Sequence, residues 1–397
     1  MRLPCAKPPG TQRTAVPQGG SHVGRRSLVY QIVAVLALLY LGWVLFSNTE
    51  QNLAAMQVKS GFGFLLQPAG FDIGESAFPY VASDTYLRAF LVGVGNTLRV
   101  SLLGIVLATI LGTLAGIGRL SHNFLLRKLC DVYVEILRNV PLLIQLLALY
   151  LVITQLLPSA HDALTLLPYT YLSKSGLQMP VPVWSMAWAP ALVGLPLGCL
   201  GAWWLLRRAQ KRQARTGGRP RRLPALLCVV GLPLVGWLAG GAPHQFDVPE
   251  ISIFNISGGI SLTPEFLALL AGLTLYTSSY IAEIVRAGIL AVSEGQLNAG
   301  AALGLTRAQS LRWIILPQAM RVIVPPITSQ YLNLAKNSSL AVTVGYPDIV
   351  SIANTSINQN GQALECISII MLVYLLISLV IALYMNWYNR RVALVER

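Results

Sequence analysis

Charged residues are scarce in this chain, and their scarcity excludes an ordinary soluble domain. Only 11% of its 397 residues are Asp, Glu, Lys or Arg, whereas about 25% is usual in soluble proteins. Hydrophobic residues make up 54%, and several apolar runs reach the roughly 20 residues that an α-helix needs to cross a bilayer. The composition therefore predicts an all-α, polytopic transmembrane helical bundle in contact with the lipid bilayer.

Reactive and metal-binding residues are also few. The 5 cysteines and 4 histidines show no paired or clustered spacing, so neither a disulfide framework nor a metal site is predicted. The sequence contains no G-x-x-x-x-G-K-[ST] phosphate loop, no H-E-x-x-H and no G-x-S-x-G. We therefore predict no catalytic residue and no cofactor on this chain, so that any ATP-driven step requires the ATPase of another chain.

Eight apolar spans are predicted, at about residues 28–47, 90–118, 134–157, 186–206, 225–241, 264–292, 321–344 and 365–388. If the N-terminus lies inside, 22 of the 29 Lys and Arg residues fall in inner segments and 3 in outer ones. The positive-inside rule then places both termini in the cytoplasm. Membrane topology thus explains the net charge of +14, and nucleic acid is not expected as a partner.

Composition divides the sequence into a tail, an anchor and a working core that is interrupted by an insertion. In chain order these are residues 1–27 (disordered cytoplasmic tail), 28–89 (N-terminal anchor helix and periplasmic segment), 90–157 (first part of the permeation core), 158–263 (inserted helix pair with a basic cytoplasmic loop) and 264–397 (second part of the core). The core is distinguished by polar and ionisable groups within its apolar runs. The outer segments 48–88 and 159–185 are expected to be irregular, with short interfacial helices.

Charged residues inside spans cost about 2.5–3.5 kcal/mol each on insertion scales, so they are candidates for function. Glu135 and Arg138 are one helical turn apart, as are Glu283 and Arg286, so each pair is predicted to neutralise itself along its own helix. A direct role in gating or substrate contact is the alternative. Arg99 has no acidic residue within a turn on its own helix. It is predicted to be an unpaired guanidinium that suits a carboxylate, with snorkelling to outer headgroups as the ordinary alternative.

The most polar patch within any predicted span is Lys336, Asn337, Ser338 and Ser339. A rise of about 1.5 Å per residue places this patch in the outer half of the membrane. The preceding Pro325–Pro326 pair is predicted to break or kink the helix, and freed backbone groups at that depth are tolerated only where they line protein or a water-filled cavity. We therefore predict a pathway-lining segment, with polar packing between helices as the alternative.

A polar loop at residues 293–317 separates two long apolar spans. It contains two capping-box patterns, Ser293-x-x-Gln296 and Thr306-x-x-Gln309. Gly304 stands between them, where a helix C-terminal glycine belongs, and Pro317 is expected to break the second helix as the chain enters the next span. A helical hairpin gripped by another protein on the cytoplasmic side is the favoured interpretation. An amphipathic hairpin lying on the membrane is the alternative.

At this loop the sequence resembles a known family. The spacing Asn298-Ala299-Gly300-x3-Gly304-x9-Ile314-x-Leu316-Pro317 is similar to the EAA loop of ABC-importer permeases. Further motifs resemble the polar-amino-acid branch of histidine and general L-amino-acid permeases: Asn96-Thr97-Leu98, Glu135-x-x-Arg138-Asn139-Val140-Pro141, Ser279-Tyr280-Ile281-Ala282-Glu283-x-x-Arg286 and Lys336-Asn337-Ser338-Ser339-Leu340. The long N-terminal extension and the inserted helix pair resemble the longer, general L-amino-acid type of subunit.

The resemblance implies a five-helix ABC-importer permease core plus extra helices, in the bacterial inner membrane. It implies that the loop couples to a cytoplasmic ABC ATPase dimer through Gln296, Asn298, Ala299, Gly300, Gly304, Leu305, Ile314, Leu316 and Pro317. The substrate pathway is expected to include Asn96, Thr97, Arg99, Tyr280, Lys336, Asn337, Ser338 and Ser339. The other implied partners are a second, non-identical permease subunit and a periplasmic amino-acid-binding protein.

Two loop positions depart from the family pattern, because its acidic residue is Asn298 here and its second alanine is Gly300. Asn298 keeps hydrogen bonding but loses the charge of an ionic contact to the ATPase. Gly300 is expected to loosen the first helix by about 1 kcal/mol relative to alanine. The alternative to an ATP-driven importer is an ATPase-independent secondary transporter or channel for small polar solutes, because broken helices and buried charges suit that class as well.

Overall fold

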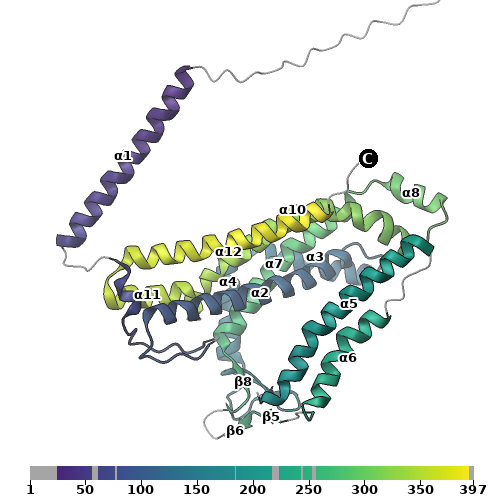
Figure 1. Cartoon of the computed structure of the whole chain (residues 1–397), viewed down its shortest axis with the longest axis horizontal. Coiled ribbons are helices and arrows are strands. Elements are labelled where there is room, and N and C mark those ends of the chain that lie inside the picture. Colours follow the sequence, from purple (N-terminus) through teal and green to yellow (C-terminus); the bar gives the residue numbers. More distant parts are fainter. Residues whose placement is uncertain are drawn as a thin grey trace, which may run out of the picture. The chain divides into compact units, whose positions relative to one another are not determined.

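The computed structural model describes residues 25–55, 61–76, 78–183, 185–216, 223–242, 245–252 and 256–392. The chain divides into two compact units at Gly61. In the first unit the described residues form α1 (Arg25–Ala55), whose apolar side chains are mostly exposed. The second unit contains the remaining described helices and strands (Figure 1). Residues 1–24 of the predicted tail, 1–27, lie outside the described residues.

Helices make up most of the second unit, which confirms the predicted fold class. The α-helices are α2 (Tyr86–Gly118), α3 (Phe124–Asn139), α4 (Leu142–Leu151), α5 (Ala189–Thr216), α6 (Leu223–Ala239), α7 (Pro264–Leu290), α8 (Glu294–Ala302), α9 (Arg307–Ser310), α10 (Leu316–Asn337), α11 (Ile349–Asn360) and α12 (Ala363–Val392). Short 3-10 turns form η1 (Phe62–Leu66), η3 (Met186–Trp188) and η5 (Ser338–Val344), and π-helical turns form η2 (Val152–Leu156) and η4 (Leu311–Ile315).

Among the described residues, four helical stretches are long and apolar enough to cross a membrane. They are α2, α7, α12 and the stretch Met186–Ala209, which includes most of α5. A fifth span results if the bent pair α3 and α4–η2 counts as one, and Val29–Leu45 and Leu223–Ala239 are shorter apolar helices. The polytopic fold is thus confirmed, whereas the number of about eight spans stays a prediction.

The predicted span at residues 134–157 is not one straight helix, because α3 and α4 meet at 105°. Pro141 has no backbone N–H and restricts the residue before it, so Val140 is extended, with φ −96° and ψ 128°. The side-chain nitrogen of Gln145 supports the bend by donating to the carbonyls of Leu137 at 2.7 Å and Val140 at 2.9 Å. The bend is therefore built into the local sequence.

The prediction for residues 159–185 is wrong in one respect, because short strands form over most of this segment in place of the expected interfacial helices. The strands here and before α7 are β1 (Leu164–Leu167), β2 (Thr170–Ser173), β3 (Gly176–Met179), β4 (Val181–Pro182), β5 (Phe246–Asp247), β6 (Glu250–Ile251), β7 (Ile256–Ser257) and β8 (Ile260–Leu262). β1, β2, β3 and β8 form one antiparallel sheet in that order, in which Leu177 pairs with both Leu172 and Leu262. β4 pairs with β5, and β6 with β7. β3 alternates buried and half-buried residues, as a strand does.

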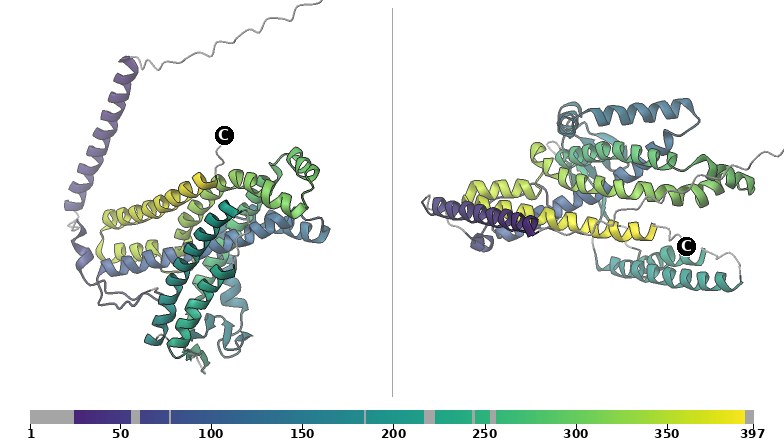
Figure 2. Two further views of the ribbon diagram at one scale, coloured as in Figure 1. Left: turned by 45° about the vertical axis from the view of Figure 1, so that its right-hand side comes forward. Right: turned by 90° about the horizontal axis from the view of Figure 1, so that it is seen from above.

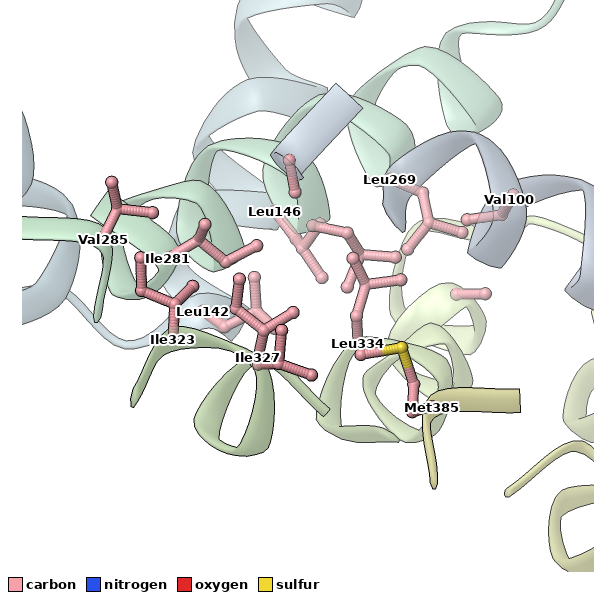
Figure 3. Packing of buried hydrophobic residues seen from close by; sticks show 14 of the residues in the cluster. Val100, Leu142, Leu146, Leu269, Ile281, Val285, Ile323, Ile327, Leu334 and Met385 are labelled. Carbon is pink, nitrogen blue, oxygen red and sulfur yellow. The ribbon is translucent and has the colours of Figure 1, made fainter. Parts of the chain in front are cut away.

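The main core lies where α2, α7 and α10 pack together. Glycines let α2 approach α7 closely: a Cβ on Gly112 would lie 2.7 Å from the carbonyl oxygen of Ser278, and one on Gly116 would lie 2.6 Å from that of Ala282. Small residues at such contacts are typical of packed membrane helices. Figure 3 shows the apolar side chains that meet in this core, among them Val100, Leu146, Leu269, Ile281, Ile323 and Leu334.

α5 and α6 form a hairpin and run side by side in Figures 1 and 2. Glycines again permit the contact, since a Cβ on Gly198 would lie 2.5 Å from the carbonyl oxygen of Cys228. The outward faces expose large apolar side chains such as Leu195 and Leu227. This exposure suits helices that face lipid.

α10 continues through Pro325–Pro326, so the proline pair does not break the helix, whereas a kink at this point stays a prediction. Both prolines are exposed, and a proline removes one helical hydrogen bond while the flanking turns can continue the helix. The backbone changes later, at Ser338, where the 3-10 helix η5 begins. That helix ends at Gly345, whose φ of +81° is left-handed.

Candidate functional site

The polar hairpin, residues 293–317, folds as α8, a turn, α9 and η4. The second predicted capping box is present: the side chain of Gln309 accepts from the N–H of Thr306 at 2.8 Å, and the Thr306 hydroxyl accepts from the N–H of Gln309 at 3.3 Å. The first is absent, because the Ser293 side chain makes no capping hydrogen bond. The N–H of Gln296 instead bonds to the Ser293 carbonyl at 3.0 Å, which uses the donor that the hydroxyl would have capped.

Gly304 closes α8 in the way that its sequence position predicts. Its φ is +74°, its N–H donates to the Ala301 carbonyl at 2.9 Å, and the N–H of Leu305 donates to the Gly300 carbonyl at 3.1 Å. These two bonds are the Schellman pattern, which satisfies carbonyls that the end of a helix leaves free. The turn between α8 and α9 is therefore fixed by its backbone.

The hairpin continues directly into α10. Pro317 does not break the helix, contrary to prediction, because it lies in the first turn of α10, where its missing N–H is tolerated. The N–H of Leu316 bonds to the carbonyl of Leu311 five residues before it, so the chain accommodates the proline with a wider turn. α9, η4 and α10 thus form one helical run over residues 307–337. The hairpin and α10 are therefore joined without an intervening loop.

Gly300 lets α8 pack against the segment that follows. A Cβ at this position would lie 2.7 Å from Cδ1 of Ile314 and 3.1 Å from Oγ of Ser310. Two large apolar side chains of the hairpin remain exposed, Leu303 at 80% and Trp313 at 68%. Beside it lies a cavity of about 900 Å³, lined by residues that include Leu120, Ile289, Leu297, Asn298, Leu305 and Ile315.

A cluster of ion pairs joins the C-terminal halves of α2 and α7 to α3. Glu283 accepts hydrogen bonds from Arg119 and, at 2.7 Å, from Arg286. Nε of Arg119 also donates to Asp131 at 2.6 Å, and Nη1 of Arg138 lies 3.8 Å from Glu283. One carboxylate of α7 therefore holds three guanidinium groups near the end of the bundle that carries the hairpin.

The predicted pair Glu283–Arg286 is present, whereas Glu135 and Arg138 do not pair. Arg138 turns toward Glu283, and its guanidinium lies 5.2 Å from the ring centroid of Tyr280. Glu135 is exposed and makes no ion pair within the described ranges. The spacing within α3 permits the pair, but the carboxylate on α7 competes for the same arginine. Arg119, Lys128, Asp131, Glu135, Arg138 and Tyr280 line a cavity of about 600 Å³ here.

Arg99 is not unpaired, contrary to prediction. Its Nη1 donates to Oε1 of Glu75 at 2.6 Å, and its guanidinium lies 4.3 Å over the ring of Phe266. Glu75 is only 9% exposed, and its other carboxylate oxygen accepts from the hydroxyl of Thr263, the residue that caps α7. A loop, α2 and α7 therefore meet at one buried carboxylate.

Asn96 and Thr97 also hold segments together. The side chain of Asn96 is fully buried and donates to the carbonyls of Glu75 and Pro347, both at 2.8 Å. The Thr97 hydroxyl accepts from the N–H of Ile349 at 3.1 Å. These contacts fix the loop before α11 against α2, and the predicted pathway role of the two residues stays a prediction.

Asp348 caps α11 and is 1% exposed. Its Oδ1 accepts from the N–H of Ser351 at 2.8 Å, and the hydroxyl of Tyr374 donates to Oδ2 at 3.4 Å. Burial raises the pKa of Asp348 from 3.8 to about 7, while backbone hydrogen bonds from Ser351 and Val350 act in the opposite direction. This carboxyl therefore takes up a proton near neutral pH.

The polar patch 336–339 marks the change from α10 to η5. Lys336 is exposed and Ser338 is buried, and the hydroxyls of Ser338 and Ser339 donate to the carbonyls of Ala335 and Lys336, each at 2.8 Å. These bonds satisfy carbonyls at the end of the helix. Tyr280 lies elsewhere, beside Arg138, so the predicted pathway residues fall in separate places and their shared role stays a prediction.

The charged members of the two ion-pair clusters that could not be identified from the sequence are Glu75, Arg119 and Asp131. Glu75 lies in an irregular segment 24 residues from Arg99, and Arg119 is separated from Glu283 by 164 residues. The available signal was weak, because charges at span ends and in loops are common. Among the described residues, no group of three or more His, Cys, Asp or Glu side chains is arranged to hold a metal ion.

Comparison with known proteins identifies the family. Residues 220–394 match the family described as "binding-protein-dependent transport system inner membrane component". The chain is 45% identical over 373 residues to the general L-amino acid transport system permease protein AapQ of Rhizobium johnstonii, and the match covers 94% of this chain and 93% of that protein. The chain belongs to this family.

A second relative also matches this chain over nearly the full length of both proteins. The glutamate/glutamine/aspartate/asparagine transport system permease protein BztB of Rhodobacter capsulatus is 39% identical over 405 residues, which covers 94% of this chain and 95% of that protein. Family membership confirms the resemblance to ABC-importer permeases of amino acids and the prediction of a transport subunit rather than an enzyme. It also favours binding-protein-dependent transport over the ATPase-independent alternative.

Proposed function

We propose that this chain is the transmembrane permease subunit of an ATP-driven importer for amino acids and that its polar hairpin docks on a cytoplasmic ABC ATPase. The family supports the dependence on a binding protein. The relatives support the substrate class, because their names specify general L-amino acids in one case and glutamate, glutamine, aspartate and asparagine in the other. ATP is used by the partner ATPase, and this chain needs no cofactor of its own.

The observation that carries the coupling role is the attachment of the hairpin at both ends. α7 ends at Leu290 and α8 begins at Glu294, while α9 runs through η4 into α10. α7 and α10 form the core together with α2. A rigid displacement of the hairpin therefore moves two of the three core helices, which is what an external motor requires.

The surface chemistry of the hairpin suits a largely apolar partner cleft. Residues 293–317 contain only three charged residues, Glu294, Arg307 and Arg312. Leu303 stands at the tip before the turn and is 80% exposed. Asn298 is exposed and offers hydrogen bonds where the EAA pattern places an acid. We expect the contact to depend on burial of Leu303 more than on ion pairs.

The orientation follows from this assignment. The hairpin faces the cytoplasm together with both termini, and the opposite end of α7, at Thr263, faces the periplasm. The uneven distribution of Lys and Arg supports the same orientation. At the periplasmic face an amino-acid-binding protein delivers the substrate, and a second, non-identical permease subunit completes the path.

The proposal is tested by capture of tagged protein from native membranes in mild detergent, with mass spectrometry of the chains that copurify. We expect an ATPase with a phosphate-loop motif and a second permease. Leu303→Glu is expected to abolish recovery of the ATPase, whereas Leu164→Glu, at an exposed position of β1, is expected to leave it unchanged. Recovery of this chain alone in several detergents would contradict the proposal.

A further inference from the structure

A buried carboxylate fastens the loop before α2 to the first half of α2 and to the start of α7. Glu75 binds Arg99 of α2 through one oxygen and Thr263 of α7 through the other. Its backbone carbonyl accepts from Asn96, which also binds the carbonyl of Pro347 before α11. We call the contact of Glu75 with Arg99 and Thr263 the outer latch. It joins three elements whose separation would open this end of the bundle.

The guanidinium of Arg99 is only partly used by the latch. A guanidinium has five N–H donors, and one of them, on Nη1, bonds to Glu75 at 2.6 Å. The Arg99 side chain keeps 24% of its surface exposed, whereas that of Glu75 keeps 8%. Glu75 also borders a cavity of about 410 Å³, lined by residues that include Asp72, Thr263, Glu265, Pro347, Ser351 and Thr355. Space for a small polar molecule therefore adjoins the latch.

We propose that Glu75 occupies Arg99 in place of the carboxylate of the substrate, and that the α-carboxylate of an arriving amino acid displaces Glu75 and opens the latch. The ligand class is any amino acid with a free carboxylate, whatever its side chain. This inference rests on the proposed function, because it takes this end of α7 to be the periplasmic end.

The energetic cost of an unpaired Arg99 favours exchange of Glu75 for another carboxylate over simple loss of Glu75. Removing Glu75 without replacement leaves a largely buried guanidinium without its ion-pair partner, which is strongly destabilising. Replacing one carboxylate by another keeps Arg99 paired, and a planar guanidinium can bind a carboxylate through two parallel hydrogen bonds. The latch is therefore expected to stay closed in the absence of substrate and to open when a carboxylate arrives.

Thr263, the second partner of Glu75, connects the latch through α7 to the polar hairpin. The Thr263 hydroxyl accepts from the N–H of Phe266 at 3.1 Å as the cap of α7, besides donating to Glu75. α7 extends for 27 residues from this cap, or about 40 Å at 1.5 Å per residue. The polar hairpin follows its other end. Release of Glu75 frees the start of α7 without removing the cap itself.

The test uses the complete transporter in proteoliposomes, without the binding protein. The measurement is ATP hydrolysis as a function of the concentration of free amino acid or of its methyl ester, which lacks the carboxylate. Glu75→Gln removes the competing anion and is expected to lower the half-maximal amino acid concentration roughly tenfold, within the range usual for coupled sites. Arg99→Gln is expected to abolish the response, and the ester is expected to stimulate none of the proteins.

The matched control is Arg88→Gln. Arg88 pairs with Asp84 at 3.2 Å next to the same loop, but its side chain is 50% exposed, so its loss is expected to leave the response at the wild-type level. Arg99→Lys is the second variant if Arg99→Gln does not insert. It keeps the pair with Glu75 but loses the forked geometry, and a weakened response is expected.

Two results overturn the latch: Glu75→Gln responds to free amino acid as the wild type does, or acid and ester stimulate Glu75→Gln equally. These two results count against the latch only if the wild-type transporter shows ATP-driven, binding-protein-dependent uptake. If the wild-type complex shows no such uptake, the proposed function is refuted, and the latch with it. Thermal unfolding of each variant distinguishes a lost response from a lost fold.

Discussion

Replacing Gly304 with alanine isolates the contribution of the turn in the polar hairpin. The residue has a φ of +74°, and a Cβ there would meet no heavy atom within 4 Å, so the substitution changes only backbone energy. An L-residue in the left-handed region costs about 1–2 kcal/mol. That cost lowers the ratio of closed to open hairpin by about 5- to 30-fold. We expect Gly304→Ala to weaken ATPase binding and ATP-driven uptake by up to that factor. The neighbouring capping box of Thr306 and Gln309 also stabilises the turn and so limits the loss.

Gly295 provides the matched control within the same hairpin. It lies in the first turn of α8, where a Cβ would approach only Oγ of Ser293, at 4.0 Å. In a helix, alanine is favoured over glycine by up to about 1 kcal/mol. Gly295→Ala therefore adds the same methyl group with the opposite energetic sign. The assays are affinity of the purified ATPase for the permease in detergent, and uptake by proteoliposomes at equal amounts of inserted protein.

A role of the Gly304 turn in coupling is refuted if Gly304→Ala binds the ATPase and transports as the wild type does, while hydrogen exchange shows that the turn has opened. It is also refuted if Gly295→Ala causes an equal loss, because the added methyl group and not the backbone conformation would then be responsible. Gly304→Asn should fall between wild type and alanine, since asparagine tolerates the left-handed region better than most residues.

Three further outcomes test the packing and the charges. Glu283→Gln removes the carboxylate shared by Arg119, Arg138 and Arg286. Because Glu283 is partly exposed, we expect thermal unfolding to show a loss of roughly 2 kcal/mol of unfolding free energy, which is less than the 3–5 kcal/mol of a fully buried pair. Glu135→Gln should cause almost no loss in the same assay. The folded protein holds the proton of Asp348 up to a pKa of about 7, whereas an unfolded aspartate releases it near 3.8. Stability should therefore fall as pH rises between these values, and Asp348→Asn, which keeps an acceptor for the cap, should flatten the dependence. Gly112→Ala would place a Cβ 2.7 Å from a rigid carbonyl of α7 and should cost about 1–3 kcal/mol of unfolding free energy, as overpacking does. Gly231 lies inside α6, where an added Cβ would have no neighbour within 4 Å, and in the same assay Gly231→Ala should stabilise the protein by up to about 1 kcal/mol, the helix preference of alanine over glycine.

Proline shows how far a local pattern can be interpreted. Pro317 is expected to end a helix, and Pro141 lies inside a predicted span, yet only Pro141 lies at a bend, because Val140 before it is extended. Pro317 follows a π-helical turn and needs no N–H in the first turn of α10. The conformation of the preceding turn decides the outcome, and that turn is itself held by packing against α8. The capping signals of the hairpin were similarly divided, since Thr306 and Gln309 form their box and Ser293 does not.

By itself the sequence determined the membrane location, the helical class, the order of the main helices and the position of the polar hairpin. These properties follow from apolar run length and from caps and glycine turns, which act over a few residues. Only the tertiary structure decided which charges meet: Arg99 with Glu75, and Glu283 with Arg119 across 164 intervening positions. An ion pair is selected by distance through space and by burial, and several equally spaced acids and bases along a chain leave that selection open until the helices have packed.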